Sequence, residues 1–221
     1  MPRRIVGAAF LSLDGVMQAP GGPTEDPTGG FAHGGWLAKN SDEAIEQEIG
    51  KLFAGPFDLL LGRRTYDIFA AYWPYQPTDN PIAAAFATCA KYVLTHSDAP
   101  LEWTGSHRLA DLDALAALKR RDGLDLVIQG SSTLYPPLLE RGLIDRLVTM
   151  VAPVTLGTGK RLFGQGTPAR VYKPVGQRIG SAGCVISVFE PGGEVETGSF
   201  GGDNPSEAEH ARQRKIAAGT W

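Results

Sequence analysis

The sequence predicts an α/β protein with one central, mostly parallel sheet that has a mixed edge and helices on its faces. Over the first two thirds of the chain, short apolar segments with strand character alternate with amphipathic segments, an order typical of parallel sheets. After residue 144 the apolar segments follow one another without a helical pattern, which is typical of antiparallel strands. The 221 residues, 43% of them hydrophobic, are enough for one large domain with a substantial core.

The amino-terminal part begins with an apolar strand, expected over residues 4–11. A Gly/Pro-rich segment then continues to Gly35, and a connection of this length is more often a functional lid than filler. Apolar residues on one face predict a helix over residues 41–54, which Asn40 or Ser41 can cap.

The middle of the chain repeats the alternation of strand and helix. The expected strands here cover residues 57–61, 91–95 and 124–128. The expected helices cover residues 65–71, 81–90 and 111–121. One more helix is expected after the strand at 124–128, and it stops at Arg141. The strand at 124–128 is almost continuously apolar, as in a central strand covered on both faces.

The last strands are expected close together. They cover residues 144–156, with a break at Pro153, then 171–179 and 184–189. The apolar density falls from Gly192 onward. We therefore expect two parts, a folded domain of residues 1–190 and a polar carboxyl-terminal extension of residues 191–221.

Composition excludes several classes of function. A net charge of −3 gives no sign of nucleic-acid binding, and no segment is long enough to cross a membrane. The two cysteines lie far apart, and the four histidines show no ligand spacing, so we expect neither a disulfide framework nor a metal site. A cytoplasmic protein with reduced thiols is the expectation.

Polar turns follow three of the expected strands. The turn residues are Gly62, Arg63, Arg64 and Thr65 after the second strand, Thr95 and His96 after the third, and Gly130, Ser131, Ser132 and Thr133 after the fourth. Because ligands bind at the carboxyl ends of parallel strands, these turns predict a nucleotide cleft. A glycine followed by Ser131 or Ser132 as a helix cap suits a phosphate. The alternatives are an ordinary strand-to-helix turn and solvated surface arginines. Neither the P-loop string nor the GxGxxG fingerprint is present.

Further motifs occur in an order that resembles a known family. They are Ser12–Gly15, Pro20–Pro23, Gly34–Trp36, Leu61–Tyr66, Tyr72–Pro74, Gly130–Ser132, Gly142–Asp145 and Pro153–Phe163. Over residues 3–190 the chain resembles the dihydrofolate-reductase-like family, which includes the reductase domain of the riboflavin-pathway deaminase-reductase. The resemblance implies a central, mainly parallel sheet flanked by helices, NADPH as cofactor and a homodimer. The deaminase signature HxE…PCxxC is absent, so only the reductase part is resembled.

The resemblance also implies roles for individual residues. The implied cofactor contacts are Gly15 and Met17 at the nicotinamide, Gly62, Thr65, Gly130, Ser131, Ser132, Thr133 and Leu134 at the pyrophosphate, Thr95 and His96 at the adenosine, and Arg63 and Arg64 at the 2′-phosphate. An arginine pair at that position implies a preference for NADPH over NADH.

The substrate side departs from the family pattern. Asp14 and Asp42 are the candidate catalytic acids, and each has a structural alternative, as a turn former and as a first-turn helix acid respectively. Trp36, Tyr72 and Trp73 are candidates for a substrate-binding wall, with ordinary packing as the alternative.

Three functions compete. The first is an NADPH-dependent reductase that transfers a hydride to a small heterocyclic or carbonyl substrate, for which a compound like 5-amino-6-(5-phosphoribosylamino)uracil is one candidate. The second is a non-catalytic nucleotide-binding module. The third is a redox protein that holds a flavin or deazaflavin on the same fold.

Overall fold

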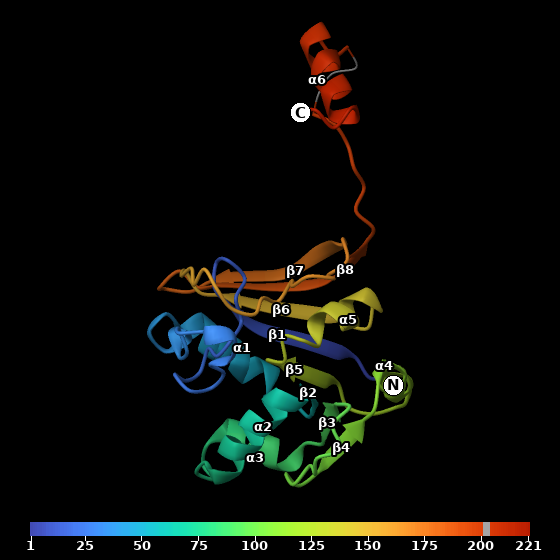
Figure 1. Ribbon diagram of the computed structural model, residues 1–221. Coiled ribbons are helices and arrows are strands. Elements are labelled where there is room, and N and C mark those ends of the chain that lie inside the picture. Colours follow the sequence, from blue (N-terminus) through green and yellow to red (C-terminus); the bar gives the residue numbers. More distant parts are fainter. Residues whose placement is uncertain (201–203) are drawn as a thin grey trace.

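A single sheet organises the protein, as seen in the computed structural model, which describes residues 1–200 and 204–221 (Figure 1). Its strands are β1 (Ile5–Leu11), β2 (Asp58–Gly62), β3 (Lys91–Leu94), β4 (Ser106–Leu109), β5 (Leu126–Gln129), β6 (Arg146–Val151), β7 (Val171–Ile179) and β8 (Val185–Gly193). Their order is β4-β3-β2-β5-β1-β6-β8-β7. All pairs from β4 to β6 are parallel, whereas β8 is antiparallel to both β6 and β7. The expected α/β class with a mostly parallel, mixed sheet is confirmed.

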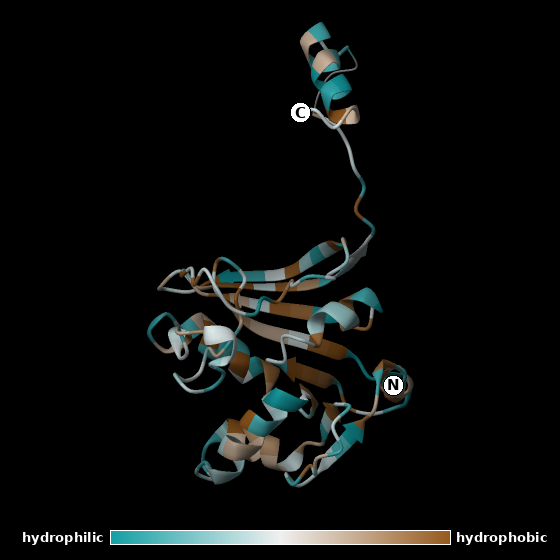
Figure 2. Ribbon diagram, viewed as in Figure 1, coloured by the Kyte–Doolittle hydropathy of each residue, from teal (hydrophilic) through white to brown (hydrophobic). Residues whose placement is uncertain are grey.

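Helices cover both faces of this sheet. They are α1 (Glu43–Leu52), α2 (Arg63–Tyr72), α3 (Pro81–Thr88), α4 (Leu112–Arg120), α5 (Tyr135–Glu140) and α6 (Glu207–Ala217), with short 3-10 turns η1 (Thr28–Gly30), η2 (Trp36–Lys39) and η3 (Trp73–Tyr75). Residues of α4 and α5 belong to one hydrophobic core cluster, and those of α1, α2 and α3 belong to the clusters on the other face. The central strands are correspondingly apolar in Figure 2, whereas α6 is largely hydrophilic.

A close approach between β1 and α5 fixes where α5 sits. A Cβ atom on Gly7 would lie 2.7 Å from Cε1 of Tyr135, so only glycine leaves room for that ring. The Tyr135 hydroxyl donates a hydrogen bond of 3.2 Å to the carbonyl of Ala8. Full burial raises the pKa of this phenol, which stays a neutral donor. Through this contact the first turn of α5 packs closely against the centre of the sheet.

Two elements differ from the sequence prediction. Strand β4 was not expected, because its residues are mostly polar and partly exposed, as an edge strand permits. Helix α6 was also not expected; none of its residues is buried, and its side-chain hydrogen bonds stay within the helix and its ends. Strand β8 continues to Gly193, and no described residue after it is buried.

The helix caps also differ in detail from the prediction. Asp42 caps α1, because its side chain accepts from the backbone N–H of Ala44, whereas Asn40 instead donates to the carbonyl of Trp36. Among the described helices, none combines the length and the apolar character needed to cross a bilayer.

Candidate functional site

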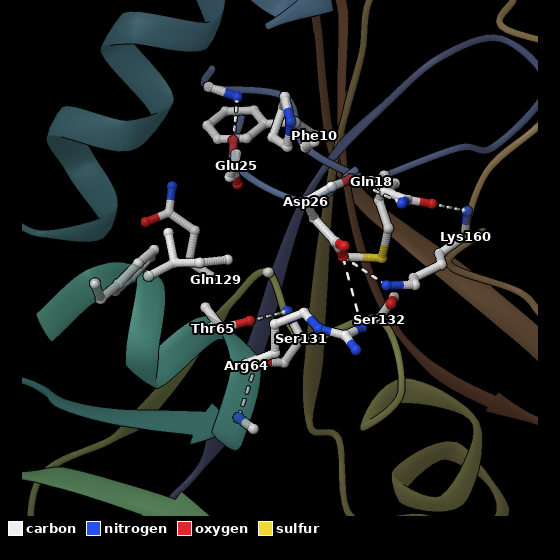
Figure 3. Close-up of a pocket in the computed structure, with 18 of the residues that line it drawn as sticks. Phe10, Gln18, Glu25, Asp26, Arg64, Thr65, Gln129, Ser131, Ser132 and Lys160 are labelled. Carbon is white, nitrogen blue, oxygen red and sulfur yellow. Dashed lines mark hydrogen bonds and ion pairs between the residues drawn. The ribbon is translucent and has the colours of Figure 1, made fainter. Parts of the chain in front are cut away.

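A cavity of about 540 Å³ lies at the carboxyl ends of β1, β2 and β5 (Figure 3). Phe10 of β1, Gly62 at the end of β2 and Gln129 at the end of β5 all line it. The loop between β1 and α1 forms one side and helix α2 forms the opposite side. This is the edge of a parallel sheet at which ligands bind in open α/β folds.

The structure brings together some of the residues expected at a site and leaves others out. Those that line the cavity are Met17, Gly62, Arg63, Arg64, Thr65, Tyr72, Trp73, Gly130, Ser131, Ser132 and Thr133. Those absent from its lining are Asp14, Gly15, Trp36, Asp42, Thr95, His96 and Leu134. The turns after β2 and β5 therefore share the cavity, whereas the turn after β3 does not reach it.

The β5 turn is tied to the start of α2 by two hydrogen bonds. The backbone N–H of Ser131 donates to Oγ1 of Thr65 at 3.0 Å, and the N–H of Gly62 donates to Oγ of Ser131 at 2.9 Å. Gly130 has a φ of 86° and Ser131 a φ of 58°, so both lie in the left-handed region. These bonds hold Ser131 in that strained conformation.

The expected capping roles are not found. Helix α5 begins at Tyr135 after Leu134, so neither Ser131 nor Ser132 caps it. Thr65 lies inside the first turn of α2, whose cap position is Gly62. The sequence could not place the start of α5, because five residues, 130–134, separate it from the end of β5.

The cavity nevertheless offers groups that suit a phosphate. The N-terminus of α2 borders it, and first-turn N–H groups of a helix have no partner within the helix. The backbone N–H groups of Ser132 and Thr133 also form no hydrogen bond within residues 1–200. Figure 3 shows Thr65, Ser131 and Arg64 grouped at this end of the cavity.

The two arginines are in different states. Nε of Arg63 donates to Asp67 at 2.9 Å, and its Nη1 donates to the carbonyl of Ala99 at 2.9 Å. Arg64 is 55% exposed, and its guanidinium lies 3.7 Å from a carboxylate oxygen of Asp26. Arg64 therefore keeps more of its hydrogen-bonding capacity for a ligand than Arg63 does.

A polar network around the buried carboxylate of Asp26 lies at the rim and was not anticipated from the sequence. Nζ of Lys160 lies 2.5 Å from Asp26 and 2.8 Å from Thr28, while its backbone N–H donates to Gln18 at 3.0 Å. Burial opposes ionisation of Asp26, but the hydrogen bonds from Lys160 and Thr28 outweigh it and lower the pKa. Lys160 stands in a GxGK string that predicts a β-turn, and nothing in that string indicates a partner in the loop before α1.

Asp14 lies outside the cavity and accepts several hydrogen bonds. Its carboxylate receives the Ser12 hydroxyl at 2.6 Å and the backbone N–H groups of Leu156 and Gly157 at 3.0 and 2.8 Å. These bonds, with that of Ser12 the strongest, hold the pKa of Asp14 well below its usual range. A carboxylate held ionised in this way is a poor proton donor, and its role here is to fasten the turn after β1 to the chain after β6.

Asp42, the other candidate catalytic acid, also lies outside the cavity. Besides capping α1, its carboxylate accepts from the backbone N–H groups of Ala182 and Cys184, each at 3.1 Å. Burial alone would raise the pKa of this acid, but the three amide donors reverse the effect and lower it. Asp42 joins α1 to the turn between β7 and β8.

The other residues that do not line the cavity have structural surroundings. The indole of Trp36 is buried and donates to the carbonyl of Gln18 at 2.9 Å. Oγ1 of Thr95 accepts from the N–H of Ser97 at 3.1 Å, and His96 is exposed. Leu134 is buried in the core beneath α5.

Sequence reasoning also missed Glu25 and Gln129, two further polar residues that line the cavity. One oxygen of Glu25 accepts from the backbone N–H groups of Gly21 and Gly22 at 2.6 and 3.2 Å. Burial raises the pKa of Glu25, and the nearby Asp26 adds to the effect. Glu25 lies in a long loop, where no helical or strand periodicity indicates which side chains face a cavity. No group of three His, Cys, Asp or Glu side chains suited to a metal occurs in the described part of the chain.

Comparison with known proteins identifies relatives over most of the chain. The model of the RibD C-terminal domain family matches residues 3–178. YyaP of Bacillus subtilis (strain 168) is 24% identical over 192 residues, covering 85% of this chain and 94% of YyaP.

Solved structures share the fold at low identity. A riboflavin-biosynthesis-like protein from Shewanella sp. PV-4 has a TM-score of 0.64 at 18% identity, covering 87% of this chain and 99% of its own. A pyrimidine reductase-like protein from Corynebacterium diphtheriae has a TM-score of 0.55 at 13% identity, with 86% and 92% covered. Dihydrofolate reductase from Enterococcus faecalis, solved with NADP(H) and RAB-propyl, has a TM-score of 0.54 at 15% identity, with 85% and 96% covered.

Proposed function

The chain belongs to the RibD C-terminal domain family, and on this basis we propose that it is an NADPH-dependent reductase acting on a small heterocyclic or carbonyl compound. The family and the fold support a reductase type. The observation that carries the finer proposal is the shared cavity at the turns after β2 and β5, where a helix N-terminus, free backbone amides and an available arginine meet.

The residues present fit the phosphates of the cofactor. The N-terminus of α2 and the N–H groups of Ser132 and Thr133 would hold the pyrophosphate, as such groups commonly do. Arg64 would pair with the 2′-phosphate, with Arg63 next to it on the same helix turn. When bound, NADPH supplies a hydride to the substrate. The protein's own part is to orient the two molecules and to exclude water from the cavity.

Equilibrium titration with NADPH and NADH tests this proposal. We expect NADPH to bind at least tenfold more tightly than NADH, because a charge-assisted hydrogen bond is worth about 1.5–3 kcal/mol. Arg64→Met should remove most of that preference and leave the affinity for NADH unchanged. Equal affinity for the two cofactors in the wild-type protein would remove the 2′-phosphate role, and no binding at millimolar concentration would remove the proposal itself.

The same protein preparation separates the two rival functions. Tight NADPH binding without oxidation across pterins, aminopyrimidine nucleotides and quinones would favour a non-catalytic module. A flavin or deazaflavin absorbance in the purified protein would favour the third function. A homodimer and a cytoplasmic location stay predictions, and sedimentation equilibrium measures the first of them.

A further inference from the structure

The cavity has two chemically different ends. One end holds the charged and hydrogen-bonding groups already assigned to the cofactor, including Arg64, Ser132 and Lys160. The other end is formed by apolar and aromatic side chains from β1, η2, α2 and η3. These are Phe10, Leu37, Ile68, Phe69, Tyr72 and Trp73. Figure 3 shows Phe10 and Glu25 apart from Arg64 and Ser132.

The cations that line the cavity are paired with carboxylates or, in the case of Arg64, assigned to the cofactor phosphate as well. Arg63 pairs with Asp67 at 2.9 Å, while Lys160 and Arg64 share Asp26 at 2.5 and 3.7 Å. No Lys or Arg other than these lines the cavity within the described ranges. A phosphate or carboxylate placed against the apolar end would lose its hydration without gaining a counter-charge, and that loss costs several kcal/mol.

Four side chains at the apolar end can form hydrogen bonds, Tyr72 and Trp73 through their phenol and indole groups, and Gln129 and Glu25 through an amide and a carboxyl group. The amide of Gln129 has no hydrogen-bond partner in the described part of the chain, so its donor and acceptor are both available. Oε2 of Glu25 receives the N–H groups of Gly21 and Gly22, which leaves Oε1 without a partner among the described residues. The loop thus fixes the direction of the Glu25 carboxyl while one of its oxygens stays open to a ligand.

We propose that the apolar end of this cavity takes an uncharged, planar carbonyl or heterocyclic compound, whose polar edge hydrogen-bonds to Gln129 and to the carboxyl group of Glu25. This inference rests on the proposed function for its chemical step. Reduction of a C=O or C=N bond needs a hydride, supplied by NADPH, and a proton, supplied by Glu25 Oε1–H, which then regains a proton from water. Burial raises the pKa of Glu25, the direction that favours the protonated carboxyl group. A phosphorylated substrate is disfavoured at this end, because no unpaired cation there would replace the hydration of its phosphate.

Two probes of nearly the same shape test the inference by binding alone. Coumarin is a neutral planar carbonyl heterocycle, and coumarin-3-carboxylate carries one negative charge. Titration calorimetry with the full chain, with and without saturating NADP+, should give at least tenfold tighter binding of coumarin. Failure of NADP+ to bind would affect the proposed function, whereas the probe preference is measured independently of it. The inference would be overturned if neither probe binds at about 1 mM, which is on the order of the weakest specific affinities. It would also be overturned if the two probes bind equally well.

Variants locate the probe at the proposed end. Ile68→Lys adds a cation to the apolar wall and should shift the preference at least tenfold toward coumarin-3-carboxylate. Glu25→Leu should weaken coumarin binding about fivefold, as expected for the loss of one neutral hydrogen bond, whereas Glu25→Gln should keep it, because the amide still donates. Unchanged preference in Ile68→Lys would place the probe elsewhere and overturn the inference.

A pH series separates the hydrogen bond of Glu25 from a merely structural role. The charged groups that share the cavity with Glu25 are Asp26 from its own loop, Arg63 and Arg64 from α2, and Lys160 from the chain after β6. Although burial works against them, the hydrogen bonds from Lys160 and Thr28 lower the pKa of Asp26, which is the opposite direction to the shift of Glu25. Coumarin binding to the wild-type protein should therefore weaken as pH rises and Glu25 loses its proton, and Glu25→Gln should abolish this dependence. The same pH dependence in both proteins would contradict the role of Glu25.

Discussion

Replacing Asp42 by alanine should destabilise the fold strongly while leaving cofactor binding intact. The carboxylate makes three hydrogen bonds, one to the first turn of α1 and two to the backbone N–H groups of Ala182 and Cys184. Loss of a helix cap costs about 1 kcal/mol. Each of these two N–H groups, buried at Cys184 and part-buried at Ala182, costs about 1.5 kcal/mol when left without its acceptor, so the free energy of unfolding should fall by about 4 kcal/mol in total.

Denaturant unfolding followed by circular dichroism measures this change. For a chain of this size, about 4 kcal/mol corresponds to a fall in Tm of about 10 °C. The matched control is Glu46→Ala, which removes an exposed acid on the same helix and should change stability by about 0.5 kcal/mol or less. A nearly unchanged midpoint for Asp42→Ala would refute the structural role. Loss of NADPH binding at unchanged stability would instead assign the carboxylate to the site.

The contribution of Asp42 should also depend on pH with a defined sign. Its pKa is lowered in the folded protein from the ordinary value of 3.8, so the ionised form is the one that stabilises the fold. The stability difference between wild type and Asp42→Ala should be fully present above that ordinary value. It should shrink as pH falls through the lowered pKa of the folded state. A difference that grows on acidification would contradict the assignment.

Three further predictions concern the turn, the loop and the tail. Gly130→Ala places a side chain at a φ of 86° with its Cβ 3.2 Å from Thr65. The free energy of unfolding in urea should fall by about 1–2 kcal/mol, and NADPH should bind more weakly. An unchanged affinity would show that this turn does not contact the cofactor. Lys160→Met leaves Asp26 buried without its closest cation, so the free energy of unfolding should fall by about 3 kcal/mol. In a double-mutant cycle, adding Asp26→Asn should recover part of that stability. Additive losses would show that the two residues are not coupled. Truncation after Gly193 should leave Tm within about 1 °C, because no described residue beyond it is buried, and a larger fall would show that the tail packs on the domain.

The order of strands and helices in the domain was predictable, because each apolar segment carries its own periodicity and each turn its own glycine or proline. The apolar run over residues 124–128 predicted a central strand by itself, and the structure places this strand at Leu126–Gln129. Strand β4 was not predicted, because an edge strand tolerates polar residues and its sequence therefore shows no apolar pattern. The family resemblance is confirmed by the match over residues 3–178 and by the shared fold.

What the sequence determined by itself, therefore, is the sheet, the family and the glycine turns that border the cavity. Only the tertiary structure decided which carboxylates face it. Asp42 is directed to the β7–β8 turn and Glu25 into the hollow, and Lys160 meets Asp26 across 134 residues of sequence. The physical reason is that a side chain's direction and protonation depend on amides, charges and burial supplied by distant segments, none of which a local pattern records.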